Sequence, residues 1–92
     1  MREKFTPEEF EKIEHLFYFA IGAKNKSEAQ EYIRKLDHYN SLISGYSLSV
    51  YSEFISATKE ASGQVSDKSR KIEIAKQLLY KVEMECIEKC IE

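Results

Sequence analysis

The chain has 92 residues, of which 42% are hydrophobic and 33% are charged, and its formal net charge is −2. This length suits one domain with a modest core, and five Phe and six Tyr supply apolar bulk that a disordered chain lacks. Because the two signs of charge are interspersed and nearly balanced, general attraction to nucleic acid or anionic lipid is excluded. The charged opening Met1-Arg-Glu-Lys does not have the form of a secretory signal, and no apolar run reaches the roughly 18 residues of a membrane span. We therefore expect a cytoplasmic protein.

The first predicted helix covers residues 7–21. Thr6 can act as its N-cap, Pro7 suits the first helical position, and Glu9 can complete a capping box. Apolar side chains then recur every three or four residues, which predicts one buried face. Gly22 ends this helix.

The second predicted helix is the longest, at residues 27–62. Ser27 with Gln30 forms a capping box at its start, and the apolar side chains that follow keep helical spacing with no phase slip at Gly45. A turn at Ser44-Gly45 is the alternative, and it would give a compact four-helix bundle. The apolar stripe consists of Ala29, Tyr32, Leu36, Tyr39, Ile43, Tyr46, Val50, Phe54, Ala57 and Ala61.

The third predicted helix covers residues 67–90, after a break at Ser62-Gly63-Gln64 and with Ser66 and Asp67 as possible caps. One apolar stripe runs along its whole length, but a second stripe begins only at Tyr80. If the helices are antiparallel, helix one can cover only the part of helix three from Tyr80 onward. We therefore expect a single all-α domain over residues 1–92, in which a short N-terminal helix packs on the open end of a long antiparallel hairpin. The other end of the hairpin, residues 46–78, would have no cover.

The sequence contains no arrangement typical of catalysis or of a metal site. The only histidines are His15 and His38, and His15 is predicted to lie on the solvated face of its helix. Cys86 and Cys90 are four residues apart on a predicted helix, and a zinc site needs about four ligands. The glycines are too few and too far apart for a phosphate-binding loop. We predict no enzymatic activity, no catalytic residues, no cofactor and no metal.

The uncovered hairpin end predicts a protein–protein interaction surface, because an apolar surface without cover usually marks a contact site. We expect a small adaptor, inhibitor or regulator, of a size that suits a phage or mobile element, which forms a homodimer or binds a larger protein. On this placement, Tyr51→Glu and Ile55→Glu should leave the protein folded, whereas Phe54→Asp should unfold it. The predicted surface combines apolar side chains, a small residue and a basic rim: Tyr46, Leu48, Tyr51, Ile55, Ser52, Lys68, Arg70 and Lys71.

A nucleic-acid-associated accessory protein is the first alternative. Lys68, Arg70 and Lys71 lie at the start of a predicted helix, where a phosphate would also meet the helix dipole. Binding would then use the face between Lys68 and Lys81.

An assembly subunit is the second alternative. Thr6-Pro7-Glu8-Glu9-Phe10, followed by Ile43-Ser44-Gly45, resembles the layout of the WXG family of small type VII secretion substrates. The resemblance implies a dimeric helical hairpin of about this length. The sequence departs from the family pattern because Ile43 replaces the signature Trp and a break at Gly22 interrupts the first long helix.

Overall fold

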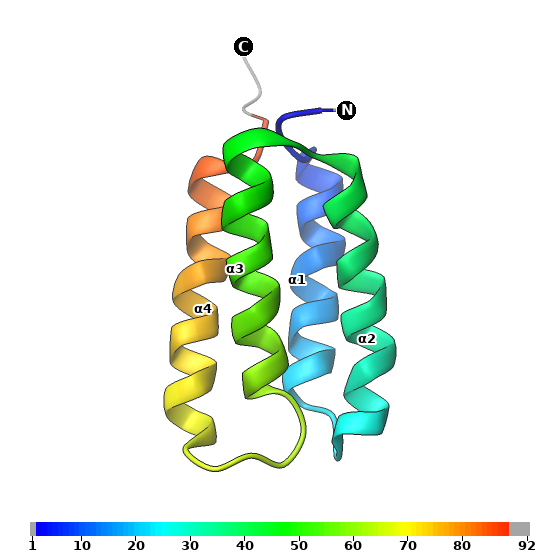
Figure 1. The fold of residues 1–92 in the computed structure, drawn as a ribbon, viewed down its shortest axis with the longest axis vertical. Helices are drawn as coiled ribbons and strands as arrows, with labels where there is room; N and C mark the ends of the chain where they lie inside the picture. The colour runs from blue at the N-terminus through cyan, green and yellow to red at the C-terminus, as the bar shows by residue number, and fades with distance from the viewer. Residues whose placement is uncertain (1, 89–92) are drawn as a thin grey trace.

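Four helices lie side by side along the long axis of a 42 × 22 × 22 Å molecule in a computed structural model, which describes residues 2–88 (Figure 1). They are α1 (Pro7–Ile21), α2 (Lys26–His38), α3 (Gly45–Ala61) and α4 (Lys68–Glu85), with the short 3₁₀ helix η1 (Tyr39–Leu42) between α2 and α3. α1 packs with α2 as one hairpin and α3 with α4 as another. Both hairpin turns are at one end of the bundle, and both ends of the described chain are at the other (Figure 1).

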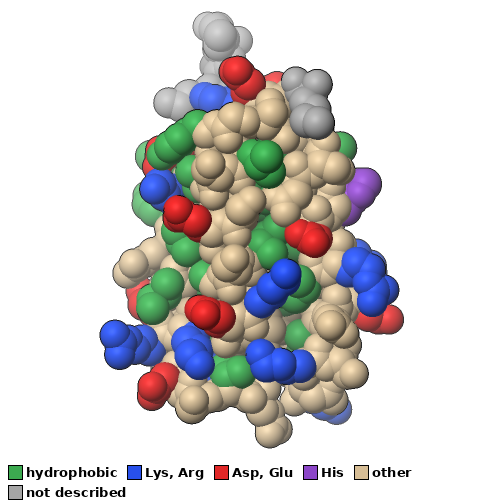
Figure 2. Space-filling model, in the orientation of Figure 1, with side chains coloured by type: hydrophobic (Ala, Val, Ile, Leu, Met, Phe, Trp, Pro, Cys, Tyr) green, Lys and Arg blue, Asp and Glu red, His purple; other side chains and the backbone are tan. Residues whose placement is uncertain are grey.

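The outer surface of the bundle carries charges of both signs. Figure 2 shows Lys and Arg side chains gathered toward the end that holds the two hairpin turns, with Asp and Glu interspersed among them. Within residues 2–88, no helix combines the length and the apolar character needed to cross a membrane.

The all-α class is confirmed, but the prediction of one helix over residues 27–62 is wrong. The chain turns between α2 and α3, so the compact four-helix alternative describes the fold. Every helix is then short, with 13 to 18 residues, and no long hairpin with a bare end exists in the described chain. The long hairpin implied by the resemblance to WXG proteins is absent for the same reason.

Local polar groups favour the turn after α2. The Asn40 side-chain amide donates to Asp37 Oδ1 at 2.9 Å, and the Ser41 hydroxyl donates to the His38 carbonyl oxygen at 2.8 Å. Such bonds offer the backbone an alternative to continued helix. Gly45 then adopts a φ of +68°, a left-handed conformation that glycine reaches without the steric penalty of a Cβ atom.

The N-terminal segment before α1 completes this turn. The Arg2 amide donates to the Leu42 carbonyl oxygen at 3.3 Å, and the Ser44 amide donates to the Arg2 carbonyl oxygen at 2.9 Å. Backbone groups that the break in the helix releases are therefore paired by a segment about 40 residues away in sequence.

Phe5, in the same segment, fills the core at this end. Its amide donates to the Cys86 carbonyl oxygen at 2.8 Å, and its own carbonyl oxygen accepts from the Glu88 amide at 2.8 Å. The ring is fully buried and meets the rings of Tyr39 and Tyr51 edge-on, with centroids 6.1 and 5.0 Å away. Pairing with Phe5 accounts for the end of α4 at Glu85, short of the predicted residue 90, which lies outside the described residues.

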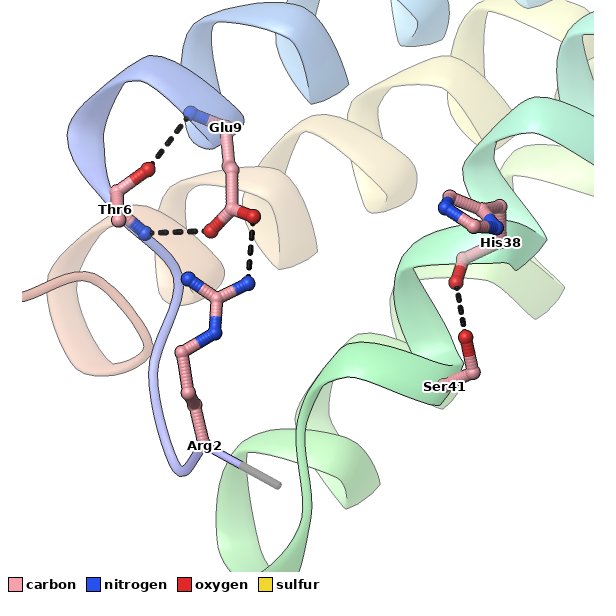
Figure 3. A network of polar contacts seen from close by, with 5 residues as sticks. All are labelled: Arg2, Thr6, Glu9, His38 and Ser41. Carbon is pink, nitrogen blue, oxygen red and sulfur yellow. Dashed lines mark hydrogen bonds and ion pairs between the residues drawn. The ribbon is translucent and has the colours of Figure 1, made fainter.

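The predicted start of the first helix is confirmed at Thr6. The Glu9 amide donates to Thr6 Oγ1 at 3.2 Å, and the Thr6 amide donates to Glu9 Oε1 at 2.9 Å, so both halves of the capping box form (Figure 3). The Arg2 guanidinium lies 2.6 Å from Glu9 Oε2 and holds the pKa of that carboxyl below its ordinary value. This network links the N-terminal segment to the first turn of α1.

The caps predicted for the other helices are wrong in detail. α2 is capped by Asn25, whose side chain accepts from the Glu28 amide at 2.9 Å, and Ser27 lies inside the helix. Asp67 does precede α4, but its φ is +53° and its side chain makes no capping bond.

Gly63 and Gly45 offer a matched pair of substitutions, because both have positive φ. A Cβ atom on Gly45 would meet nothing within 4 Å, whereas one on Gly63 would lie 2.9 Å from the backbone nitrogen of Lys26. We expect Gly45→Ala to cost roughly 1 kcal/mol from the left-handed conformation alone, and Gly63→Ala roughly 3 kcal/mol because backbone overlap is added. Urea unfolding measures both, and equal losses would mean that the two hairpin turns do not pack together.

Candidate functional site

Two of the residues predicted for the interaction surface are in the core. Tyr51 is 0% exposed and Ile55 is 3% exposed. The Tyr51 hydroxyl donates to the Leu36 carbonyl oxygen at 2.6 Å, and burial raises the pKa of that hydroxyl. Because α2 folds back along α3, it covers the flank of α3 on which these residues lie. Neither can contact a partner in this fold, which corrects their predicted place on the surface.

The other predicted residues of α3 remain accessible in part. Tyr46 is exposed, and its hydroxyl donates to Glu85 Oε1 at 2.6 Å. Leu48 is half-buried against the core, and Ser52 is exposed on the outer face of the helix. These side chains are near the middle and the N-terminal end of α3.

The predicted basic rim is at the opposite end of the bundle from Tyr46. The Lys68 ammonium donates to the Gly63 carbonyl oxygen, Lys71 is half-buried, and Arg70 is exposed. The eight predicted residues therefore do not form one continuous surface.

A shallow open groove of about 400 Å³ lies between α1 and α2. It is lined by two lysines, two histidines and two half-buried apolar side chains, namely Lys12, His15, Leu16, Lys35, His38 and Tyr39. We call this surface the α1–α2 groove. Among its lining residues in the described chain there is no carboxylate, and all five side chains that carry N–H or O–H groups, the Tyr39 hydroxyl included, can donate hydrogen bonds.

Helix geometry explains how the α1–α2 groove forms. Residues 12, 15 and 16 share one side of α1, and residues 35, 38 and 39 share one side of α2, because positions three and four apart lie on the same helix face. The antiparallel hairpin brings these two triplets together. Figure 3 shows His38 at the last turn of α2, where its carbonyl oxygen accepts from Ser41.

An aromatic pair extends the apolar floor of the groove toward the α1–α2 turn. The rings of Phe19 and Tyr32 are stacked, with centroids 5.4 Å apart and an interplanar angle of 22°. The Lys35 ammonium lies 6.0 Å from the centroid of the Tyr32 ring, within the range of a cation–π contact. The whole surface is an apolar strip bordered by the ammonium groups of Lys12 and Lys35 and by two imidazoles.

Sequence reasoning missed this groove. His15 is exposed, as predicted, but the residues that face it across the hairpin belong to another helix, which local sequence patterns do not reveal. The sequence does contain one signal of the groove. A histidine followed by a large side chain occurs in both helices, at His15-Leu16 and His38-Tyr39, and in both a lysine lies three residues before the histidine. That signal becomes informative only once helices α1 and α2 are known to pair.

The metal-ligating side chains of the described residues are scattered, and the one described cysteine is buried. Within residues 2–88, no three His, Cys, Asp or Glu side chains gather closely enough to hold a metal ion. Cys86 is buried, and burial raises the pKa of its thiol, which disfavours the reactive thiolate. Cys90 lies outside the described residues.

The protein is therefore a small four-helix bundle. The α1–α2 hairpin carries a groove with an apolar floor and basic side chains along its edges. No family model matches the chain, and neither a curated protein nor a solved structure gives a match. The α1–α2 groove is therefore the feature from which a function can be inferred.

Proposed function

We propose that the protein is a small non-enzymatic interaction module, an adaptor, inhibitor or regulator, that binds an acidic amphipathic helix of a larger protein. The α1–α2 groove would be the binding site. The observation that supports this proposal is the ring of Lys12, His15, Lys35 and His38 around an apolar floor.

A helix suits the shape of the groove. Two antiparallel helices present a furrow in which the apolar face of a third helix can pack. From Lys12 to Phe19 the groove follows about two turns of α1, roughly 10 Å, so a ligand would place apolar residues at positions i, i+4 and i+7. Those residues would contact Leu16 and Tyr39 at one end and the stacked ring of Phe19 at the other.

Charge would contribute more to the specificity of binding than to its affinity. An exposed ion pair contributes about 0.2–1 kcal/mol, so the apolar contacts must supply most of the affinity. The formal net charge of the whole chain is −2, and an acidic ligand gains only from the local cations of the groove. We therefore expect weak binding with a clear preference for acidic over basic helices.

The proposal is tested with three matched amphipathic peptides that share their apolar residues and carry Glu, Gln or Lys at the flanking positions. In ¹⁵N-labelled protein the Glu peptide should shift the amide signals around Leu16 and Lys35 most strongly. Lys12→Glu/Lys35→Glu should weaken binding of the Glu peptide roughly 10- to 30-fold and favour the Lys peptide, because two attractions become repulsions.

Lys24→Glu/Lys59→Glu is the matched control, since it changes the net charge equally at two exposed positions outside the groove. It should leave the order of the peptides unchanged. The proposal fails if no peptide binds, or if the two double variants weaken the Glu peptide to the same extent.

Nucleic-acid binding through the face between Lys68 and Lys81 stays a prediction with weaker support. The Lys68 ammonium is engaged by the Gly63 carbonyl oxygen, and the Lys76 ammonium lies 6.0 Å from the centroid of the Tyr18 ring. Binding of a duplex oligonucleotide that weakens steeply as salt rises would favour that function instead.

A further inference from the structure

The outer face of α4 exposes large apolar side chains. Ile74 is 47% exposed, Tyr80 is 63% exposed and Met84 is 59% exposed. They lie away from the core face of the helix, which consists of Ala75, Leu79 and Val82. Half of the large hydrophobic side chains that are exposed in the described chain are therefore on this one helix.

The residues of this face repeat at alternating steps of three and four. Positions 70, 73, 77, 80 and 84 form one such series, and positions 70, 74, 77, 81 and 84 form a second beside it. This spacing produces a straight seam along a helix and is the pattern by which two helices pair.

The seam of one helix is complementary to the seam of a second copy that runs in the opposite direction and is centred on the same residue, Gln77. Residues at equal distances before and after Gln77 then lie opposite each other, so Glu73 faces Lys81 and Ile74 faces Tyr80. Arg70 pairs with Met84, whose thioether can pack on the aliphatic part of the arginine. An amide at the centre can both donate to and accept from its own copy.

We propose that two copies of the protein associate through α4, with the helices antiparallel and a two-fold axis at Gln77. Each Glu73 then faces the partner's Lys81, and each Ile74 packs on the partner's Tyr80. A parallel arrangement would place Glu73 opposite the partner's Glu73 and Lys81 opposite the partner's Lys81, so like charges select the antiparallel one.

The distribution of charge along α4 supports the same orientation. Basic side chains lie near its start, at Arg70 and Lys71, and acidic side chains lie at its end, at Glu83 and Glu85. Antiparallel pairing brings the basic start of each helix near the acidic end of its partner. α2 makes no contact with α4 within the described residues, so the α1–α2 groove stays accessible in both copies.

The association is measured by sedimentation equilibrium from about 10 μM to about 1 mM, because an interface of one helix face is small and binds weakly. The full chain should approach the mass of a dimer at the upper end. Gln77→Glu should shift the equilibrium at least tenfold toward monomer, since it puts two carboxylates on the axis. Gln64→Glu, an exposed change of equal charge in the α3–α4 loop, should not.

A charge exchange tests the register. Glu73→Lys and Lys81→Glu should each weaken the dimer, and the double variant should restore it, because only the reversed seam places these positions opposite each other. A protein that is monomeric throughout, or a dimer that ignores Gln77→Glu, overturns the proposal, as does a double variant that is not restored. The groove variant Lys12→Glu/Lys35→Glu should dimerise normally, so the self-association and the proposed function can fail separately.

Discussion

Phe5→Ala is expected to destabilise the fold by about 3–5 kcal/mol, which is the usual loss for a buried Phe truncated to Ala. The ring has no exposed surface, and it packs between the rings of Tyr39 and Tyr51. Removal of the ring leaves a cavity between the N-terminal segment and the rings of Tyr39 and Tyr51. A small domain is stable by only about 5–15 kcal/mol, so this loss is a large fraction of the total.

Phe19→Ala is the matched control for this prediction. Phe19 is 58% exposed and stacks on the Tyr32 ring, so its truncation should cost about 1 kcal/mol or less. Urea unfolding monitored by circular dichroism gives both values. Equal losses for the two variants would show that the N-terminal segment is not docked in solution.

Local signals predicted the first helix with correct ends. Thr6 and Glu9 pair with each other and are three residues apart, and Pro7 marks the first helical position. All the residues that define the start of this helix are therefore in one short stretch. The prediction failed where the partners are distant. The turn after α2 is completed by bonds between Arg2 and residues of the α2–α3 connection, and no pattern in residues 27–62 reveals that pairing.

The apolar stripe predicted over residues 27–62 is a second example of what local sequence patterns can and cannot reveal. Leu36, Val50 and Phe54 are buried as predicted, but Tyr46 on the same stripe is exposed, and Tyr51 and Ile55 beside it are buried. Leu36 belongs to α2, whereas Val50 and Phe54 belong to α3, and the two helices happen to share a phase. Periodicity therefore identified most of the stripe that faces the core, but neither its full width nor the direction in which the chain continues.

Tyr51→Glu and Ile55→Glu are both expected to abolish folding, which reverses the outcome expected from a bare hairpin end. Each substitution would bury a carboxylate that no described group is placed to pair, and the loss of several kcal/mol exceeds what a small bundle can sustain. The Tyr51 hydroxyl donates to the Leu36 carbonyl oxygen, and a carboxylate there would meet that oxygen with repulsion.

Two controls separate burial of charge from other effects. Tyr51→Phe removes only the hydroxyl that donates to Leu36 and should cost about 1 kcal/mol. Ser52→Glu adds the same carboxylate one residue further along α3, at an exposed position, and should leave the helical signal and the cooperative unfolding intact. If Tyr51→Glu remained as folded as Ser52→Glu, α2 would not cover that flank of α3. The folding of Tyr51→Glu, Tyr51→Phe and Ser52→Glu therefore tests whether α2 packs against this flank of α3.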